Sequence, residues 1–158
     1  MLQGEQGIGK STFFDVLAGD WFGDSMKSGK DKDDLLVLRR SWIQEWGELD
    51  KIFSKRQAGD LKAFLSCRKD TFREPYARTT KDYPRHSIIV GSVNDSSFLV
   101  DSTGNRRYWV IPVGKQQIDT KLLKEERDVI WAAAVEAYRQ GETWWLSAEE
   151  EKNNLKNN

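Results

Sequence analysis

Short apolar runs bounded by turn residues predict the β-strands of this chain. Residues 41–46 alternate between apolar and polar positions and are followed by a glycine. Residues 86–93 are rich in β-branched side chains and end at Asn94, which is typical of a buried strand. Two further apolar runs, 98–100 and 108–111, flank a cluster of turn residues and predict a hairpin.

Apolar residues three and four positions apart predict the helices. A short helix is expected over residues 10–18 and a long one over 122–140, and each is closed by a glycine. Helical spacing also occupies residues 35–40 and 58–68. Strands and helices in this succession predict an α/β fold, a sheet flanked by helices.

Three polar segments separate or follow these elements. Residues 25–34 are predicted to form a solvated loop, and residues 70–85 are too rich in charge and proline for a regular assignment. Residues 147–158 form a polar tail. A chain of 158 residues has room for one substantial core, so residues 1–146 are predicted to be a single domain.

Composition indicates the cellular compartment of the protein but says little about its activity. The 25 basic residues balance 25 acidic ones, so any nucleic-acid surface must be local. The single cysteine, Cys67, excludes an internal disulfide and is expected to be an inert, at least half-buried thiol. Because the sequence has no long apolar run, we expect a cytoplasmic protein without membrane contact.

The strongest chemical signal is the phosphate-binding loop at the start of the chain. It comprises Gly4, Glu5, Gln6, Gly7, Ile8, Gly9, Lys10 and Ser11, followed by Thr12. Glycines let the backbone N–H groups turn toward a phosphate, while the lysine supplies a cation and the serine a hydroxyl for Mg²⁺. The spacing predicts a P-loop NTPase that uses ATP and Mg²⁺.

A phosphate loop ordinarily emerges from a buried strand, yet only Met1, Leu2 and Gln3 precede it here. We therefore expect the first strand to be truncated. A central position of the sheet would then be empty.

Two acids and an amide are candidates to complete the site. Glu45 lies near the end of a predicted strand, where it can hold magnesium, and Glu48 follows three residues later. Alternatively, Glu45 is only a charge on an edge strand, and Glu48 only favours the first turn of a following helix. Asn94 can contact phosphate and water without adding negative charge, although its surroundings also fit a simple turn.

Arg106 and Arg107 open the last predicted strand, so alternation sends them to opposite faces. One of them can act as an arginine finger across a subunit boundary, which requires an oligomer. The alternative is a pair of surface arginines beside a turn. Four tryptophans in apolar-patterned elements are expected to pack in the core: Trp42, Trp46, Trp109 and Trp131.

These pieces, in this order, resemble the virulence-associated protein E family, the P-loop ATPase module of phage and mobile-element primase-helicases, which is similar in character to superfamily 3 helicases. The resemblance covers nearly the whole chain. It rests on the phosphate loop and on residues 42–49, 62–66, 70–78, 84–85, 91–94 and 98–109. The last segment, Phe-Leu-Val-Asp-Ser-Thr-Gly-Asn-Arg-Arg-Tyr-Trp, is the most specific.

The resemblance implies an AAA+ or superfamily 3 helicase-like sheet and a role for each candidate. Glu45 and Glu48 take the Walker B role, Asn94 the sensor role, and Arg106 or Arg107 the finger role. It also implies a homo-oligomeric ring in the full-length protein and single-stranded or forked DNA as partner.

The DNA-facing part is sought between residues 68 and 85, where basic residues outnumber acidic ones. The candidates are Arg73, Tyr76, Arg78, Lys81 and Arg85, with the tyrosine placed to stack on a base. The alternative is a solvated loop that is salt-bridged internally.

The leading hypothesis is therefore an ATP-driven DNA helicase module. A nucleotide-dependent regulatory or assembly module of a mobile element, without helicase activity, is the alternative. A small-molecule kinase with the same loop leaves the paired arginines and the Glu-x-x-Glu pair without a role.

Overall fold

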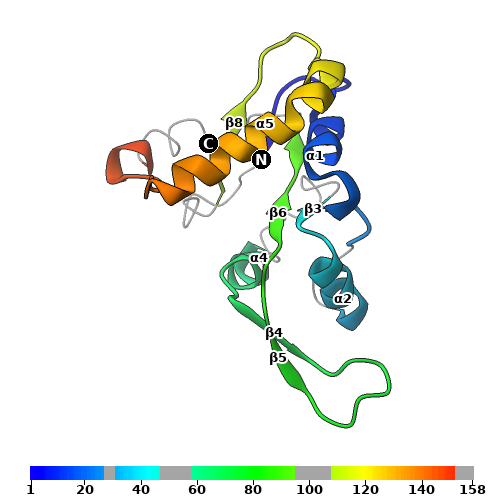
Figure 1. Ribbon diagram of the computed structural model, residues 1–158. Helices are drawn as coiled ribbons and strands as arrows, with labels where there is room; N and C mark the ends of the chain where they lie inside the picture. The colour runs from blue at the N-terminus through cyan, green and yellow to red at the C-terminus, as the bar shows by residue number, and fades with distance from the viewer. Residues whose placement is uncertain (27–30, 47–57, 95–107, 152–158) are drawn as a thin grey trace.

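A computed structural model describes residues 1–26, 31–46, 58–94 and 108–151 (Figure 1). Its α-helices are α1 (Lys10–Ala18), α2 (Lys32–Arg40), α4 (Ala58–Leu65) and α5 (Thr120–Arg139), with a 3-10 turn, η1, over Gly19–Trp21. Its strands are β1 (Leu2–Gln3), β2 (Phe22–Gly23), β3 (Ile43–Glu45), β4 (Lys69–Phe72), β5 (Lys81–Pro84), β6 (Ile88–Val90), β7 (Ser92–Val93) and β8 (Ile111–Pro112).

Residues 88–93 connect two groups of parallel strands, because β6 and β7 each pair with a different neighbour. Through β6 they pair in parallel with β3, and β3 pairs in parallel with β2. Through β7 they pair in parallel with β1, and β1 pairs in parallel with β8. Only Gly91 separates β6 from β7, and its carbonyl accepts a hydrogen bond from the Leu2 amide at 3.0 Å. Two three-stranded parallel sheets, β2-β3-β6 and β7-β1-β8, are thus joined at Gly91, and the strands follow one another in the order β2, β3, β6–β7, β1, β8.

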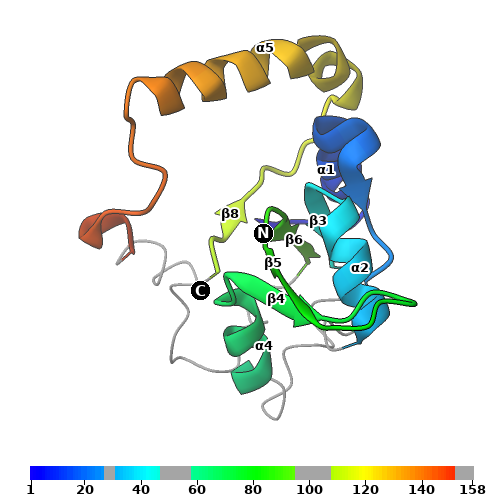
Figure 2. The ribbon, with the colours of Figure 1, turned by 60° about the horizontal axis from the view of Figure 1, so that its bottom comes forward.

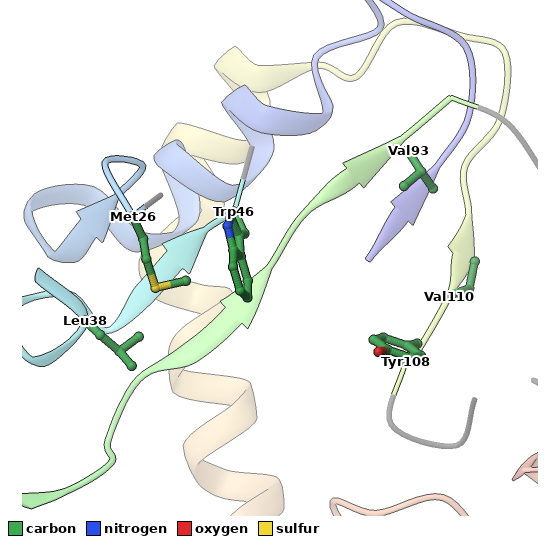
Figure 3. Close-up of a cluster of buried hydrophobic side chains, with 6 residues drawn as sticks. All are labelled: Met26, Leu38, Trp46, Val93, Tyr108 and Val110. Atoms are coloured by element: carbon green, nitrogen blue, oxygen red, sulfur yellow. The ribbon is translucent and has the colours of Figure 1, made fainter. Parts of the chain in front are cut away.

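Side chains alternate between the two faces of this sheet, as a period of two requires. One face carries a cluster of Leu2, Ile43, Phe14 and Ala18, the last two from α1, with Val90 and Trp131 packed against it. The other face carries Met26, Leu38, Trp46, Val93, Tyr108 and Val110, from strands, loops and α2 (Figure 3). Phe64 and Leu65 of α4 pack against this second cluster. Helices thus cover both faces.

The structure confirms the mixed α/β class and the principal predicted elements, with informative differences. The predicted strands at 41–46 and 86–93 contain β3 and β6–β7, and the predicted helices correspond to α1, α4 and α5. Helix α2 starts at Lys32, three residues inside the predicted loop, since Asp33 and Asp34 favour its amino end and Arg39 and Arg40 its carboxyl end.

The expectation of an empty central strand position is wrong. Leu2 and Gln3 occupy that position, with Leu2 paired to Ser92 on one side and to Ile111 on the other. Of the predicted hairpin, residues 98–100 lie outside the described residues. Its second run leads into β8, which begins at Ile111 and pairs in parallel with β1.

Residues 69–84, which the sequence left unassigned, form an antiparallel hairpin of β4 and β5. The hairpin and its turn extend away from the parallel strands (Figures 1 and 2). We call residues 69–84 the arm. Cys67, at its base, is exposed, so the prediction of a buried or half-buried thiol is wrong.

Burial of the tryptophans also departs from expectation. Trp46 is buried, but Trp42 and Trp109 are 46% and 45% exposed. Helix α5 contacts α1 and buries Leu123, whereas Val129 on its apolar stripe is 70% exposed. The described helices leave these apolar positions partly uncovered. None of the described helices is long and apolar enough to cross a membrane.

Gly23 provides a test of the β2–β3 packing. A Cβ built at this position would lie 2.2 Å from Ser41 Oγ and 2.4 Å from Gln44 Oε1, and both of these side chains are buried. Gly23→Ala is therefore expected to lower the free energy of unfolding by about 1–3 kcal/mol, as overpacking does. Gly114→Ala is the matched control, because a Cβ there meets nothing within 4 Å. Equal denaturation midpoints for the two variants would contradict this packing.

Candidate functional site

The loop between β1 and α1 has the backbone shape that its glycines permit. Gly7 and Gly9 have φ values of 84° and 94°, in the left-handed region where side chains are strained. Ile8, between them, is buried, and its carbonyl accepts a hydrogen bond from the Ile118 amide at 2.9 Å. The loop is thus anchored to the segment that precedes α5.

Helix α1 begins directly after this loop. Gly9 is its N-cap, and no side chain caps the first turn. No acidic residue lies in that turn either. Its free N–H groups and the positive end of the helix dipole consequently face the loop, an arrangement that favours a bound anion.

Parallel pairing brings three predicted residues to one edge of the sheet. The phosphate loop follows the carboxyl end of β1, Glu45 is the last residue of β3, and Asn94 follows β7. Carboxyl ends of parallel strands lie at the same edge, where ligands bind in open α/β sheets. The sequence predicted this convergence, and the hydrogen bonds at this edge reveal its geometry.

The Lys10 ammonium is at the centre of this edge. It donates to the Gly4 carbonyl at 2.8 Å, the Glu5 carbonyl at 2.7 Å and Asn94 Oδ1 at 3.0 Å. An ammonium has three protons, so each is matched by an oxygen. Lys10 is only 6% exposed, and these bonds offset the cost of burying its charge.

Ser11 and Glu45 form a second pair beside the first. Ser11 Oγ donates to Glu45 Oε1 at 2.6 Å, which holds two oxygen ligands next to each other. Burial raises the pKa of the Glu45 carboxyl, and the negative charges of Asp24 and Asp15 raise it further, whereas the Ser11 hydrogen bond opposes the shift. A cation placed here would stabilise the carboxylate.

Two residues of the site were not singled out from the sequence. Asp24 follows β2 and acts electrostatically on Glu45. Lys115 lines a cavity of about 610 Å³ beside the loop, together with Gly4, Glu5 and Asn94. Neither residue had a signal in the sequence, because the two-residue strand β2 before Asp24 was not predicted and Lys115 follows β8 in a segment without a motif.

The remaining predicted site residues are distributed as follows. Gln6 and Thr12 are exposed, in the loop and in the first turn of α1. Glu48, Arg106 and Arg107 lie outside the described residues, so their roles stay predictions. Within the described residues, no group of three or more His, Cys, Asp or Glu side chains is placed to hold a metal on its own.

Four of the five DNA-contact candidates are exposed on the arm: Arg73, Tyr76, Arg78 and Lys81. Tyr76 has a φ of 65°, an uncommon conformation for a residue with a side chain, and it is fully exposed in the turn. Arg39 of α2 steadies the arm through an ion pair with Glu74 at 2.5 Å and by lying 4.1 Å over the Tyr83 ring.

Arg85 has a different role from the DNA contact predicted for it. Its guanidinium forms a bidentate ion pair with Asp70 and donates to the Phe64 carbonyl at 2.6 Å. It also lies 4.3 Å over the Phe64 ring. Only 8% of the Arg85 side chain is exposed, so it joins the arm to α4 instead of facing solvent.

Glu45 is expected to reduce stability in the absence of a cation. Since its folded pKa is raised, the buried carboxylate costs stability above that pKa, and the cost vanishes once the pH falls below the unfolded value. Glu45→Gln should therefore raise the melting temperature at pH 7 in metal-free buffer, with a smaller gain toward pH 4. Glu149→Gln, at an exposed position, is the control. A lower melting temperature for Glu45→Gln at pH 7 would contradict this assignment.

Comparison with known proteins places the chain in a family. A search of curated proteins found no match. The model of the virulence-associated protein E-like domain matches residues 1–158, which confirms the resemblance drawn from the sequence at the level of the family. The chain therefore belongs to the family of virulence-associated protein E-like domains.

Proposed function

We propose that this domain binds ATP with Mg²⁺ and hydrolyses it. The observation that carries the proposal is the position of the Lys10 ammonium. It is enclosed by the carbonyls of the phosphate loop and by Asn94. Ser11, the next residue of α1, is hydrogen-bonded to Glu45 of β3. Cation, hydroxyl, carboxylate and amide thus meet at one edge of a parallel sheet, as a nucleoside triphosphate site requires.

The loop and the start of α1 supply the phosphate contacts. Left-handed Gly7 and Gly9 let backbone N–H groups point inward, and the uncapped first turn of α1 adds further donors. Lys10 exchanges one of its protein oxygens for a phosphate oxygen on binding. One of the three oxygens bonded to Lys10 is Asn94 Oδ1. A phosphate bound by Lys10 would therefore lie within reach of the Asn94 amide, which supports the sensor role.

Ser11 and Glu45 fit a magnesium ion by the chemistry of their oxygens. Mg²⁺ prefers hard oxygen ligands and usually takes only one or two from the protein, with waters and phosphates completing its shell. When bound, it neutralises charge that develops on the phosphates during transfer. Glu48 is proposed to orient the attacking water, and Arg106 or Arg107 to act as the finger, on the family resemblance.

The arm is proposed to contact DNA and so couple hydrolysis to translocation or unwinding of a single-stranded or forked substrate. Arg73, Arg78 and Lys81 are three exposed basic residues within five positions of the exposed Tyr76 in the chain. Cations bind the phosphate backbone, and an aromatic ring stacks on bases without reading sequence. A homo-oligomeric ring of the full-length protein would bring arms from several subunits onto one strand.

The alternative is a regulatory or assembly module that uses ATP without unwinding DNA. The helicase motor and the regulatory module would have the same nucleotide site. They differ in whether ATP hydrolysis drives movement along DNA. Hydrolysis that accelerates on addition of single-stranded DNA supports the motor, whereas a rate indifferent to DNA supports the alternative.

The nucleotide proposal is tested by Lys10→Ala. This variant should lose ATP hydrolysis and bind nucleotide more weakly, because the cation that contacts the transferred phosphate is gone. Phosphate release and nucleotide titration measure the two effects. Lys32→Ala, an exposed lysine of α2, is the control for loss of a charge. Parental turnover by a folded Lys10→Ala protein would refute the proposal.

The arm is tested by comparing exposed and buried arginines. Arg73→Ala and Arg78→Ala should each weaken binding to a single-stranded oligonucleotide and lower the salt slope by about 0.7. Arg85→Ala should instead lower the free energy of unfolding by about 3–5 kcal/mol, since it leaves Asp70 unpaired. Binding curves at several salt concentrations and denaturant titrations separate these outcomes. Unchanged affinity in both exposed variants would exclude the arm from the DNA surface.

A further inference from the structure

A second cavity lies apart from the proposed nucleotide site. It has a volume of about 730 Å³ and is walled by Trp21, Trp42 and Trp131, with Leu17 and Val135 beside them. We call it the tryptophan hollow. Trp21 directly precedes β2, and Trp42 directly precedes β3. The hollow is therefore at the amino ends of these strands, whereas the phosphate loop, Glu45 and Asn94 are at carboxyl ends.

The aromatic walls are held in place by specific contacts. Trp131 Nε1 donates to the Leu17 carbonyl at 2.9 Å, which fixes its indole against the end of α1. Trp42 stacks on Trp131, with ring centroids 5.1 Å apart and 13° between the planes. Trp21 meets Trp42 edge to face at 5.7 Å, and the two residues share a backbone hydrogen bond of 2.8 Å.

These rings remain accessible even though they are fixed. Trp21 is 59% exposed and Trp42 is 46% exposed. A concave, largely apolar surface of this size with a few polar groups is typical of a binding site. Large aromatic rings grouped at such a surface stabilise a complex when a ligand covers them.

The charges around the hollow decide which ligand suits it. Among the described residues, three carboxylates line it, from Asp20, Asp128 and Glu136, against two guanidinium groups, from Arg127 and Arg139. Arg127 forms an ion pair with Asp128 at 3.1 Å. The other charged residues of the lining are two acids, Asp20 and Glu136, and one base, Arg139. Helix α1 also ends here, which brings the negative end of its dipole to the same place.

The aromatic faces and the excess of carboxylates both favour a positively charged ligand. The π-face of tryptophan attracts cations, and arginine in particular stacks its planar guanidinium on an indole. Base stacking would use the same rings, but a phosphate backbone would meet an excess of carboxylates. The hollow therefore favours a cationic ligand with an apolar stem over a nucleic acid strand.

We propose that the tryptophan hollow binds arginine side chains presented by a basic segment of a partner protein. The guanidinium lies on the exposed Trp21 indole and pairs with Asp20 and Glu136. The methylene stem of the arginine covers the adjacent indole surface, as long basic side chains commonly do. This site is independent of the phosphate loop and of the arm.

The experiment uses the full chain and a capped peptide of alternating arginine and alanine, with binding followed by tryptophan fluorescence and by calorimetry. Trp21→Ala is expected to weaken binding about tenfold. Asp20→Asn and Glu136→Gln, at exposed positions, should each weaken it about threefold without affecting the fold. Arg139→Gln should strengthen it. Lys10→Ala should leave it unchanged, which separates this site from the nucleotide proposal.

Trp144→Ala is the matched control, because Trp144 is 70% exposed and does not line the hollow. It should leave peptide binding unchanged. The proposal is overturned if the arginine peptide does not bind, or if Trp21→Ala and Asp20→Asn bind it as the parent does. It is also overturned if a glutamate–alanine peptide or a single-stranded oligonucleotide occupies the hollow in preference to the arginine peptide.

Discussion

The buried ammonium of Lys10 is the interaction on which the site depends. A charge that is 6% exposed is tolerated only if its protons are matched by oxygens, and here the loop carbonyls of Gly4 and Glu5 and the amide of Asn94 match them. The same bonds join residues 84 positions apart in the chain. These bonds hold the phosphate loop against the end of β7. The geometry of the loop and the position of Asn94 therefore depend on each other.

That constraint can be met because residues 88–93 pair with strands on both sides. The β6 half aligns Glu45 with this edge through β3, and the β7 half aligns the loop through β1. Both pairings are parallel, so the candidate site residues follow the strands at one edge. Two-residue strands contribute little stability by themselves, and the apolar clusters on the two faces maintain the register.

Helix α1 connects the proposed nucleotide site with the tryptophan hollow. Its first residue, Lys10, belongs to the phosphate site, and Leu17 near its last turn accepts the Trp131 hydrogen bond at the tryptophan hollow. One end of the helix dipole favours an anion and the other a cation. The positive end at the loop and the negative end at the hollow therefore suit ligands of opposite charge.

The sequence by itself determined what depends on local backbone chemistry. Glycines at 7 and 9 permit the left-handed conformations that this loop adopts, so the loop and the helix after it were predictable. The β-branched run ending at Asn94 likewise favoured a strand, and β6 and β7 occupy it. The convergence of Lys10, Glu45 and Asn94 followed from the rule that parallel strands end at one edge.

Only the tertiary structure decided which side chains other elements cover. Arg85 resembled the exposed arginines of the arm, but Asp70 and Phe64 enclose it. Trp42 had the pattern of a core residue, yet 46% of it stays exposed although Trp131 of α5 stacks on its ring. Burial is a property of neighbours distant in the chain, and a local pattern of apolar and charged residues does not contain that information.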